Sequence, residues 1–212
     1  MRVWDLPTRA FHWLIAVLVF VSWGAAEWHN MELHYLSGLT ILGLLAFRLL
    51  WGLFGSSTAR FASFVRGPAA LRAHLSGSGE GGRAGHNPLG ALSVLALLAL
   101  LAIQTGTGLF ATDTDGLESG PLSFLVSYDT ADLLTEVHEI AFNLLLAMIA
   151  LHLAAIAWYL LVKRRNLVRP MVTGRDPQVT SGEMQPAGVV RFVIAAMLAA
   201  GFAWAASKGF FL

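Results

Sequence analysis

The sequence predicts an all-α membrane protein: four helices cross a bilayer as a bundle, and a fifth apolar helix follows them near the C-terminus. The composition is too apolar for a soluble domain of this size, with 56% hydrophobic residues, 13% charged residues and a mean hydropathy of +0.64. Five apolar segments are each long enough to cross a hydrocarbon core of about 30 Å. Basic and acidic residues also alternate between the segments that connect them.

The first two spans are predicted at residues 10–27 and 34–54. Asp5 is expected to cap the first helix, with Pro7 in its first turn, where a missing N–H does no harm. The first apolar run is longer than a signal-peptide core and has tryptophans near both ends. We therefore expect it to stay in the chain as a span.

The remaining three spans are predicted at residues 88–111, 137–162 and 187–206. Asn87 and Pro88 repeat the cap-and-proline pattern at the start of the third span. The sequence therefore predicts a four-span domain at 1–176, followed by a linker and a fifth span at 177–212.

The distribution of charge predicts the orientation. Residues 28–47 and 104–162 contain no Lys or Arg, and the acidic residues are concentrated there. Basic residues instead precede the first span, lie between the second and third spans, and follow the fourth. By the positive-inside rule, the N-terminus is cytoplasmic, the outer loops are acidic and the C-terminus, after five spans, is outside.

Histidines are the main candidate metal ligands, because the chain has seven of them and no cysteine. The lack of cysteine excludes disulfides, iron–sulfur clusters, thiolate zinc sites and covalently attached c-type haem. Within the fourth span, His138 and His152 are fourteen residues apart. On a helix this spacing is a rise of about 21 Å and a rotation to within about 40° of the start, so both rings leave one face.

The orientation assigns each histidine a height in the membrane. His34 begins an inward span and lies near the outer edge, as does His138. His12 begins an outward span near the cytoplasmic edge, and His152 lies deeper toward that same side. The sequence therefore predicts two pairs, His34 with His138 outside and His12 with His152 inside.

Two alternatives accompany this pairing. A single histidine within a membrane can simply bond a neighbouring carbonyl, although four at matched heights favour a shared ligand role. His86, in the loop before the third span, is the rival ligand for the inner pair. His29 and His74 fall in connecting segments, where we expect solvated side chains.

Two facing imidazoles are what a six-coordinate b haem requires at its axial positions. Ser37, Gly38 and Gly43 on the second span are small enough to let a macrocycle approach the helix backbone. Arg48 lies fourteen residues after His34, on nearly the same face, and is a candidate partner for the propionates of the inner haem.

Several stretches together resemble the bacterial cytochrome b561 family, which includes the b-type cytochrome subunits of membrane-bound nickel–iron hydrogenases. The stretches are RVWDLPTRAFHW, HYLSGLTILGLLAFRLLWGLFG, GHNPLGA, VHEIAFNLLLAMIALH and NLVRPMVTG, within residues 2–176. The resemblance implies a bacterial inner-membrane protein with a four-helix core and two non-covalent b haems. The family's ligand positions match His12, His34, His138 and His152.

The resemblance also implies a quinone site near the cytoplasmic haem. Its candidate residues are His86, Asn87, Arg9 and Arg66. The arginines could instead meet anionic lipid headgroups, as basic residues at the inner edge commonly do.

Two bis-histidine haems leave no iron position for oxygen, so the expected function is electron transfer between the quinone pool and an outer partner. The acidic outer loops favour a basic periplasmic redox protein such as a c-type cytochrome. Some family members are similar to superoxide oxidases, which is the second hypothesis, although an acidic field repels superoxide. The third is a cytochrome b anchor for a hydrogenase-like or dehydrogenase complex. No nucleic-acid partner is expected.

Overall fold

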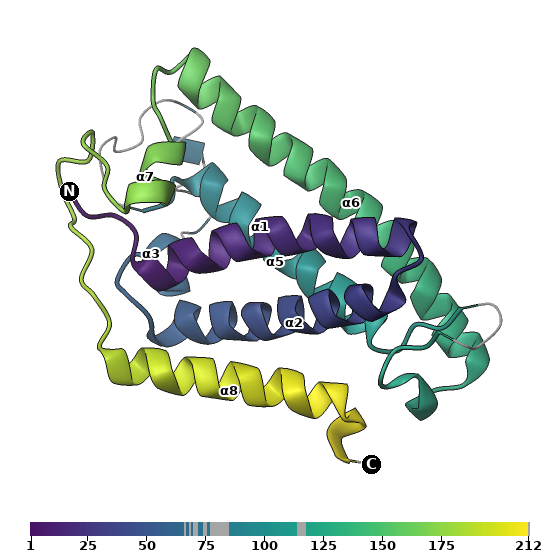
Figure 1. Cartoon of the computed structure of the whole chain (residues 1–212). Coiled ribbons are helices and arrows are strands. Elements are labelled where there is room, and N and C mark those ends of the chain that lie inside the picture. Colours follow the sequence, from purple (N-terminus) through teal and green to yellow (C-terminus); the bar gives the residue numbers. More distant parts are fainter. Residues whose placement is uncertain are drawn as a thin grey trace. The chain divides into compact units, whose positions relative to one another are not determined.

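The computed structural model describes residues 1–65, 67, 69, 72–73, 76, 85–113 and 118–211. Five long helices account for most of this part of the chain, and Figure 1 labels them. They are α1 (Leu6–Glu27), α2 (Met31–Phe54), α5 (Pro88–Gly108), α6 (Tyr128–Leu161) and α8 (Val189–Ser207). All five are long and apolar enough to cross a membrane, which confirms the five predicted spans.

Short helical elements lie between and after the long helices. They are α3 (Phe61–Phe64), η1 (Ser123–Leu125), α7 (Val168–Thr173) and η2 (Gly209–Phe211). The described residues contain no strand, only isolated bridges between Arg2 and Arg175 and between Thr112 and Ser119. The predicted all-α membrane class is therefore confirmed.

Polar side chains cap the N-termini of α1, α5 and α6. The Oδ1 atom of Asp5 accepts a hydrogen bond from the Thr8 N–H at 2.8 Å, and the Oδ1 atom of Asn87 accepts one from the Gly90 N–H at 2.7 Å. Both predicted N-caps are therefore present. The α6 helix begins at Tyr128, well before the predicted span, because the Ser127 side chain caps it through the Thr130 N–H at 3.3 Å.

The contacts divide the chain into two compact units, and every long helix contributes to both. The first unit comprises Met1–His12, Arg48–Ala96 and Met148–Ala195. The second unit comprises Trp13–Phe47, Leu97–Ala147 and Ala196–Leu212. The boundary predicted between residues 176 and 177 concerns a different division of the chain and stays a prediction.

The first unit is built around the N-terminal segment. The backbone N–H of Val3 donates to the Gly174 carbonyl at 2.8 Å, and the Met184 N–H donates to the Arg2 carbonyl at 2.9 Å. Gly174 has φ +78°, and a Cβ there would lie 2.8 Å from the Trp4 carbonyl oxygen. Only glycine suits this position. The segments that precede α1 and follow α7 are thereby held together.

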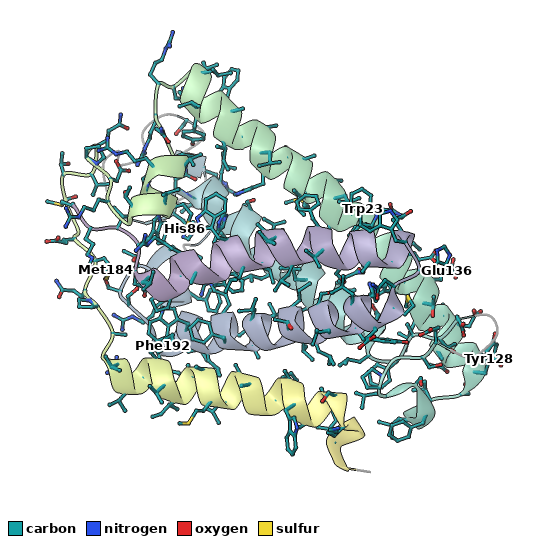
Figure 2. The ribbon with its side chains drawn as sticks, viewed as in Figure 1. Trp23, His86, Tyr128, Glu136, Met184 and Phe192 are labelled. Atoms are coloured by element: carbon teal, nitrogen blue, oxygen red, sulfur yellow. The ribbon has the colours of Figure 1, made fainter. Side chains whose placement is uncertain are left out.

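A buried polar contact joins α1 to α2 within the first unit. The Oδ2 atom of Asp5 accepts a hydrogen bond from the Trp51 indole N–H at 2.8 Å. Trp51 also packs edge-to-face on Phe192 of α8, with ring centroids 6.1 Å apart. Figure 2 labels Phe192 and, in the segment before α8, Met184. The carboxylate of Asp5 thus serves both as a helix cap and as a link between helices.

The second unit contains the contact between α2 and α8. A Cβ at Gly43 would lie 3.2 Å from the Cβ of Ala203. Close approach of two membrane helices generally depends on such small residues. The prediction that Gly43 makes room for a macrocycle is therefore wrong: this glycine makes room for α8.

Candidate functional site

The second unit brings together the first predicted histidine pair. His34 of α2 and His138 of α6 have ring centroids 6.2 Å apart, with an angle of 76° between the ring planes. The Nδ1 atom of His34 lies 2.9 Å from the carbonyl oxygen of Ser22 and 3.2 Å from its hydroxyl oxygen. A carbonyl only accepts, so the proton lies on Nδ1 and the Nε2 lone pair is left for a ligand bond.

The second histidine of this pair, His138, is held in the same tautomer. Its Nδ1 atom lies 2.9 Å from the main-chain oxygen of Gln104 and 3.3 Å from the hydroxyl of Thr107, both on α5. A Cβ at Gly108 would come within 2.9 Å of the His138 ring, so only glycine fits there. The last turn of α5 therefore encloses the imidazole, although α5 carries none of the four predicted ligands.

The first unit brings together the second predicted pair. His12 of α1 and His152 of α6 have ring centroids 6.4 Å apart, at an interplanar angle of 52°. Among the described residues, the His152 ring takes part in no hydrogen bond. The two pairs thus have similar spacing but differ in how their rings are held.

The spacing of both pairs fits a pair of axial ligands. Metal–imidazole bonds are about 2 Å long, so two bonds in line plus the radius of each ring place the ring centroids about 6 Å apart. Gly38 lies one helical turn after His34 on the same side of α2, and a Cβ there would meet nothing within 4 Å. The face of α2 that carries His34 therefore has open space beside the pair. The residues present fit a bis-histidine haem.

Ser37, the other small residue expected beside a macrocycle, is buried and bonded to its own helix. Its hydroxyl donates to the Leu33 carbonyl at 2.7 Å. The hydroxyl therefore finds its hydrogen-bond partner within α2, and Ser37 presents only a small side chain to its neighbours.

Arg48 is a buried cation in the first unit. Its side chain is 3% exposed, NH1 donates to the Ala59 carbonyl at 3.3 Å, and the guanidinium lies 5.0 Å from the centre of the Phe61 ring. Among the described residues Arg48 has no carboxylate within 4 Å. The carboxylate of Asp5 acts on the charge of Arg48 from beyond ion-pair distance. A buried guanidinium with no anion in direct contact is costly, so this site is suited to an anionic group such as a propionate.

His86, the rival ligand, lies between two aromatic rings of the first unit. The ring centroids of Trp4 and Phe64 are 4.6 and 4.7 Å from that of His86, which Figure 2 labels. Burial lowers the pKa of His86 to about 3, and the nearby positive charge of Arg48 acts in the same direction. The imidazole is neutral, and its Nδ1 atom is buried with no hydrogen-bond partner among the described residues. The ring that faces His152 is that of His12.

The other residues expected at a quinone site have structural partners. The side-chain amide of Asn87 donates to the Tyr159 hydroxyl at 2.8 Å, while its oxygen caps α5. The guanidinium of Arg9 donates to the Val172 carbonyl, and its Nε is buried with no partner in the described part of the chain. Arg66 lies outside the described residues. His29 is exposed, as expected, and His74 also lies outside the described residues.

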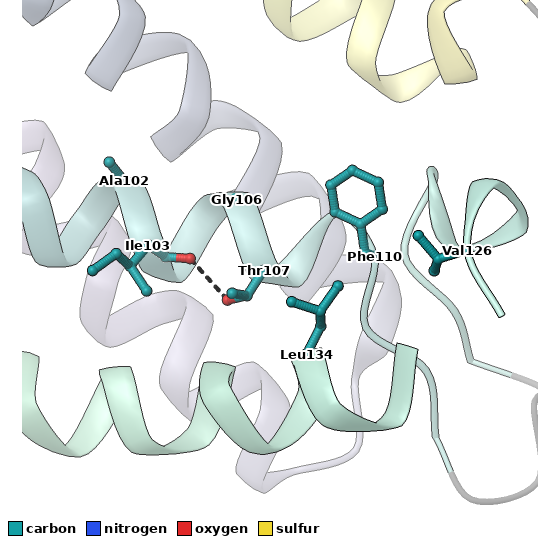
Figure 3. A pocket seen from close by; sticks show the side chains of 7 residues that line it. All are labelled: Ala102, Ile103, Gly106, Thr107, Phe110, Val126 and Leu134. Carbon is teal, nitrogen blue, oxygen red and sulfur yellow. Dashed lines mark hydrogen bonds between the residues drawn. The ribbon is translucent and has the colours of Figure 1, made fainter. Parts of the chain in front are cut away.

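An apolar pocket of about 410 Å³ lies in the second unit. Its lining consists of Ala102, Ile103, Gly106, Thr107, Phe110, Val126 and Leu134. Figure 3 shows that the Thr107 hydroxyl faces the Ile103 carbonyl, to which it donates at 2.8 Å. The pocket therefore offers no uncommitted polar group to direct a ligand.

Sequence reasoning missed the residues that hold the imidazoles of His34 and His138. Ser22 and Gln104 act through main-chain carbonyls, which no residue pattern reveals, and Gly108 acts through the absence of a side chain. One signal was present: Gln104 is an amide within a strongly apolar helix.

Comparison with known proteins gave one informative result. A family model described as prokaryotic cytochrome b561 matches residues 3–174. This range covers both histidine pairs and ends before α8. No curated protein and no solved structure matches the chain.

Proposed function

The chain belongs to the prokaryotic cytochrome b561 family, and from that premise we propose that it carries electrons between the quinone pool and a periplasmic redox protein. Membership makes it a multi-pass bacterial membrane protein that binds b haem and transfers electrons. The finer proposal is that two haems are bound, one by His34 and His138 and one by His12 and His152.

The observation that carries this proposal is the spacing of the two imidazole pairs. At 6.2 and 6.4 Å, both pairs match the separation of two axial ligands on one metal, and each pair joins α6 to another helix. When bound, a b haem supplies a one-electron change between ferrous and ferric iron. Two imidazoles per iron leave no open coordination position, which favours electron transfer over oxygen chemistry.

The side chains around each pair have distinct roles. The carbonyls of Ser22 and Gln104 accept the Nδ1 protons of the imidazoles of the second unit, so that the Nε2 atom of each ring carries a lone pair. In the first unit, Arg48 offers a buried positive charge to a propionate. Gly38 supplies open space beside His34.

The charge of each unit supports the proposed orientation. The ranges of the first unit contain thirteen of the fourteen Lys and Arg residues, whereas those of the second contain nine of the thirteen Asp and Glu residues. Lys208 is the one basic residue within the second unit's ranges. Because basic segments stay in the cytoplasm, we place the first unit on the cytoplasmic side and the C-terminus in the periplasm.

We place the quinone headgroup near His86 in the first unit. The buried, unpartnered Nδ1 atom of this neutral imidazole can hydrogen-bond a quinone carbonyl, and Arg9 has a buried Nε in the same unit. Asn87 is already engaged through both ends of its amide, so we expect it to shape the site rather than bind the headgroup. Arg66, which lies outside the described residues, stays a candidate for the quinone site.

The acidic second unit favours a basic outer partner. Surface potentials of opposite sign accelerate association, whereas an anion such as superoxide is repelled by carboxylates. We therefore propose a basic periplasmic electron carrier, such as a c-type cytochrome.

The test is to quantify haem in the purified chain and in single histidine variants. We expect two b haems per chain. His34→Ala and His138→Ala should each remove the same haem by absorption and paramagnetic resonance spectra, and His12→Ala and His152→Ala the other. One haem per chain would contradict the pairing, and loss of the inner haem in His86→Ala but not in His12→Ala would reassign the ligand.

The outer partner is tested by rapid mixing in detergent with ubiquinone present. Oxidation or reduction of the haems by a basic c-type cytochrome, weakened by salt, supports the proposal. Fast haem reduction by a superoxide pulse, abolished by superoxide dismutase, would identify a superoxide oxidase instead.

A further inference from the structure

Gln104 contacts both nitrogens of the His138 ring. Its main-chain oxygen is 2.9 Å from Nδ1, and its side-chain Nε2 is 2.9 Å from the Nε2 of His138. The carbonyl can only accept, so His138 carries its proton on Nδ1. The Nε2 atom of the ring is then an acceptor, and the amide NH₂ of Gln104 donates to it. This assignment also places the amide oxygen of Gln104, which is buried with no hydrogen-bond partner among the described residues.

We propose that Gln104 is a positioning residue for the outer haem site, whose side-chain amide competes with iron for the Nε2 lone pair of His138. This inference rests on the proposed function, in which His138 is an axial ligand. The carbonyl selects the tautomer that a ligand must have. The side-chain amide holds the same imidazole through its other nitrogen.

The surroundings of Gln104 support this role over simple space filling. Thr107 directs its hydroxyl toward the same Nδ1, and Gly108 leaves room for the ring, so one turn of α5 contacts His138 from several directions. A glutamine placed only to fill space would not leave its amide oxygen buried and unpaired, because such a group is unfavourable. The amide nitrogen's bond to His138 is what keeps the side chain there.

The consequence is a competition for one lone pair. An iron held by the Nε2 atom of His138 would take the lone pair that accepts the Gln104 amide, so the amide would have to give up this hydrogen bond. One neutral hydrogen bond typically changes an equilibrium about fivefold. Gln104 should therefore favour haem release from the outer site by about this factor.

The test uses the haem-loaded, full-length chain in detergent with excess apomyoglobin as haem acceptor. Gln104→Met keeps the length of the side chain and removes the donor. We expect the outer haem of this variant to leave about fivefold more slowly than in the parent chain. The outer haem is identified as the kinetic phase that is missing in His34→Ala. Its midpoint potential should not change in Gln104→Met, because the main-chain carbonyl remains.

Two further variants make the result decisive. Thr105→Val is the matched control: its hydroxyl bonds the Leu101 carbonyl at 2.8 Å in the same turn of α5, and its loss should leave the rate unchanged. Gln104→Asn keeps an amide that is one carbon too short to reach His138, and it should behave like Gln104→Met. It also serves as the probe if the methionine variant fails to accumulate.

The proposal would be overturned if the Gln104 substitutions did not slow the loss of the outer haem. Faster or unchanged loss of the outer haem in both Gln104 variants would mean that the amide supports the loaded site or merely fills space. A parent chain with no outer haem would overturn the proposed function as well, and the haem content of the parent distinguishes that case.

Discussion

The two units hold similar histidine pairs in opposite electrical settings. Ring separations are 6.2 Å in the second unit and 6.4 Å in the first. In the second unit, both imidazoles donate to backbone carbonyls and the surrounding ranges are acidic. In the first unit, a buried arginine is present, and His152 forms no hydrogen bond with any described residue.

The residues that would bind the iron and the residues that would tune its potential are therefore different in kind. Two histidines of suitable spacing suffice to hold a haem iron, whereas hydrogen bonds to the ligands and nearby charges tune its potential. A carbonyl that accepts the Nδ1 proton makes an imidazole more basic and stabilises the ferric state. A buried cation stabilises the ferrous state.

The largest expected effect is the loss of one haem without the other. Gly108→Val places a side chain where even a Cβ would lie 2.9 Å from the His138 ring, so the imidazole is displaced. We expect about one haem per chain, with the spectrum of the first unit intact. Gly106→Ala is the control, because a Cβ there meets nothing within 4 Å. Retention of both haems in Gly108→Val would show that α5 does not position His138.

The next effect concerns the potential in the first unit. Removing the buried charge in Arg48→Leu should lower the midpoint potential of that unit's haem by roughly 100 mV, the equivalent of a charged hydrogen bond of about 2 kcal/mol. Arg48→Lys keeps the charge and should recover part of the shift. Redox titration followed by absorption checks both variants. An unchanged potential in Arg48→Leu would remove the arginine from the haem site.

A pH effect on stability is expected from His86 in the first unit. Its folded pKa is lowered to about 3, so below pH 6.5 the unfolded chain binds a proton that the folded chain does not. The free energy of unfolding therefore loses nothing to His86 well above pH 6.5. It declines as the pH falls below that value, by about 2 kcal/mol at pH 5. The variant His86→Phe keeps a ring beside Trp4 and Phe64. Between pH 7 and pH 5 its melting temperature should change less than that of the parent chain. The exposed His29→Phe is the control, and an equal pH response in both variants would contradict the assignment.

In the unmodified chain, we expect the haems of the two units to have different midpoint potentials. We expect the haem of the second unit to have the lower potential, by roughly 60 mV, the equivalent of about 1.4 kcal/mol. The titration assigns each potential by comparison with His34→Ala and His12→Ala. This order makes electron transfer toward the quinone the downhill direction, and the reverse order would show that other features outweigh ligand hydrogen bonding.

The smallest effect concerns the acidic surface of the second unit, which we propose faces the periplasm. Asp129 and Asp132 are exposed near the start of α6. Replacing both with Asn should slow electron exchange with a basic cytochrome c about twofold and reduce its dependence on salt, while leaving both haem spectra unchanged. A rate that does not depend on salt in the parent chain would contradict electrostatic docking.

Much of the architecture could be predicted from the sequence. The five spans, the caps at Asp5 and Asn87, and the pairing of His34 with His138 and of His12 with His152 all appear in the structure. These features depend on hydropathy, local cap chemistry and the helical repeat, which are properties of neighbouring residues. Whether the histidines bind haem stays a proposal.

Other features were beyond prediction because they depend on how the helices pack. Gly43 was expected beside a macrocycle but faces α8, since nothing in the helical repeat says which neighbour meets a small residue. His86 was expected to be a possible ligand, and the aromatic rings of Trp4 and Phe64 that enclose it come from distant segments.

The sequence by itself determined the membrane class, the alternation of basic and acidic connecting segments and the four histidines that could serve as ligands, because composition and periodicity encode them directly. Only the tertiary structure decided how those histidines are held. The carbonyls of Ser22 and Gln104, the amide of Gln104 and the space at Gly108 act on residues twelve or more positions away. Such contacts exist only once helices pack, since a main-chain carbonyl has no residue type that a pattern could reveal.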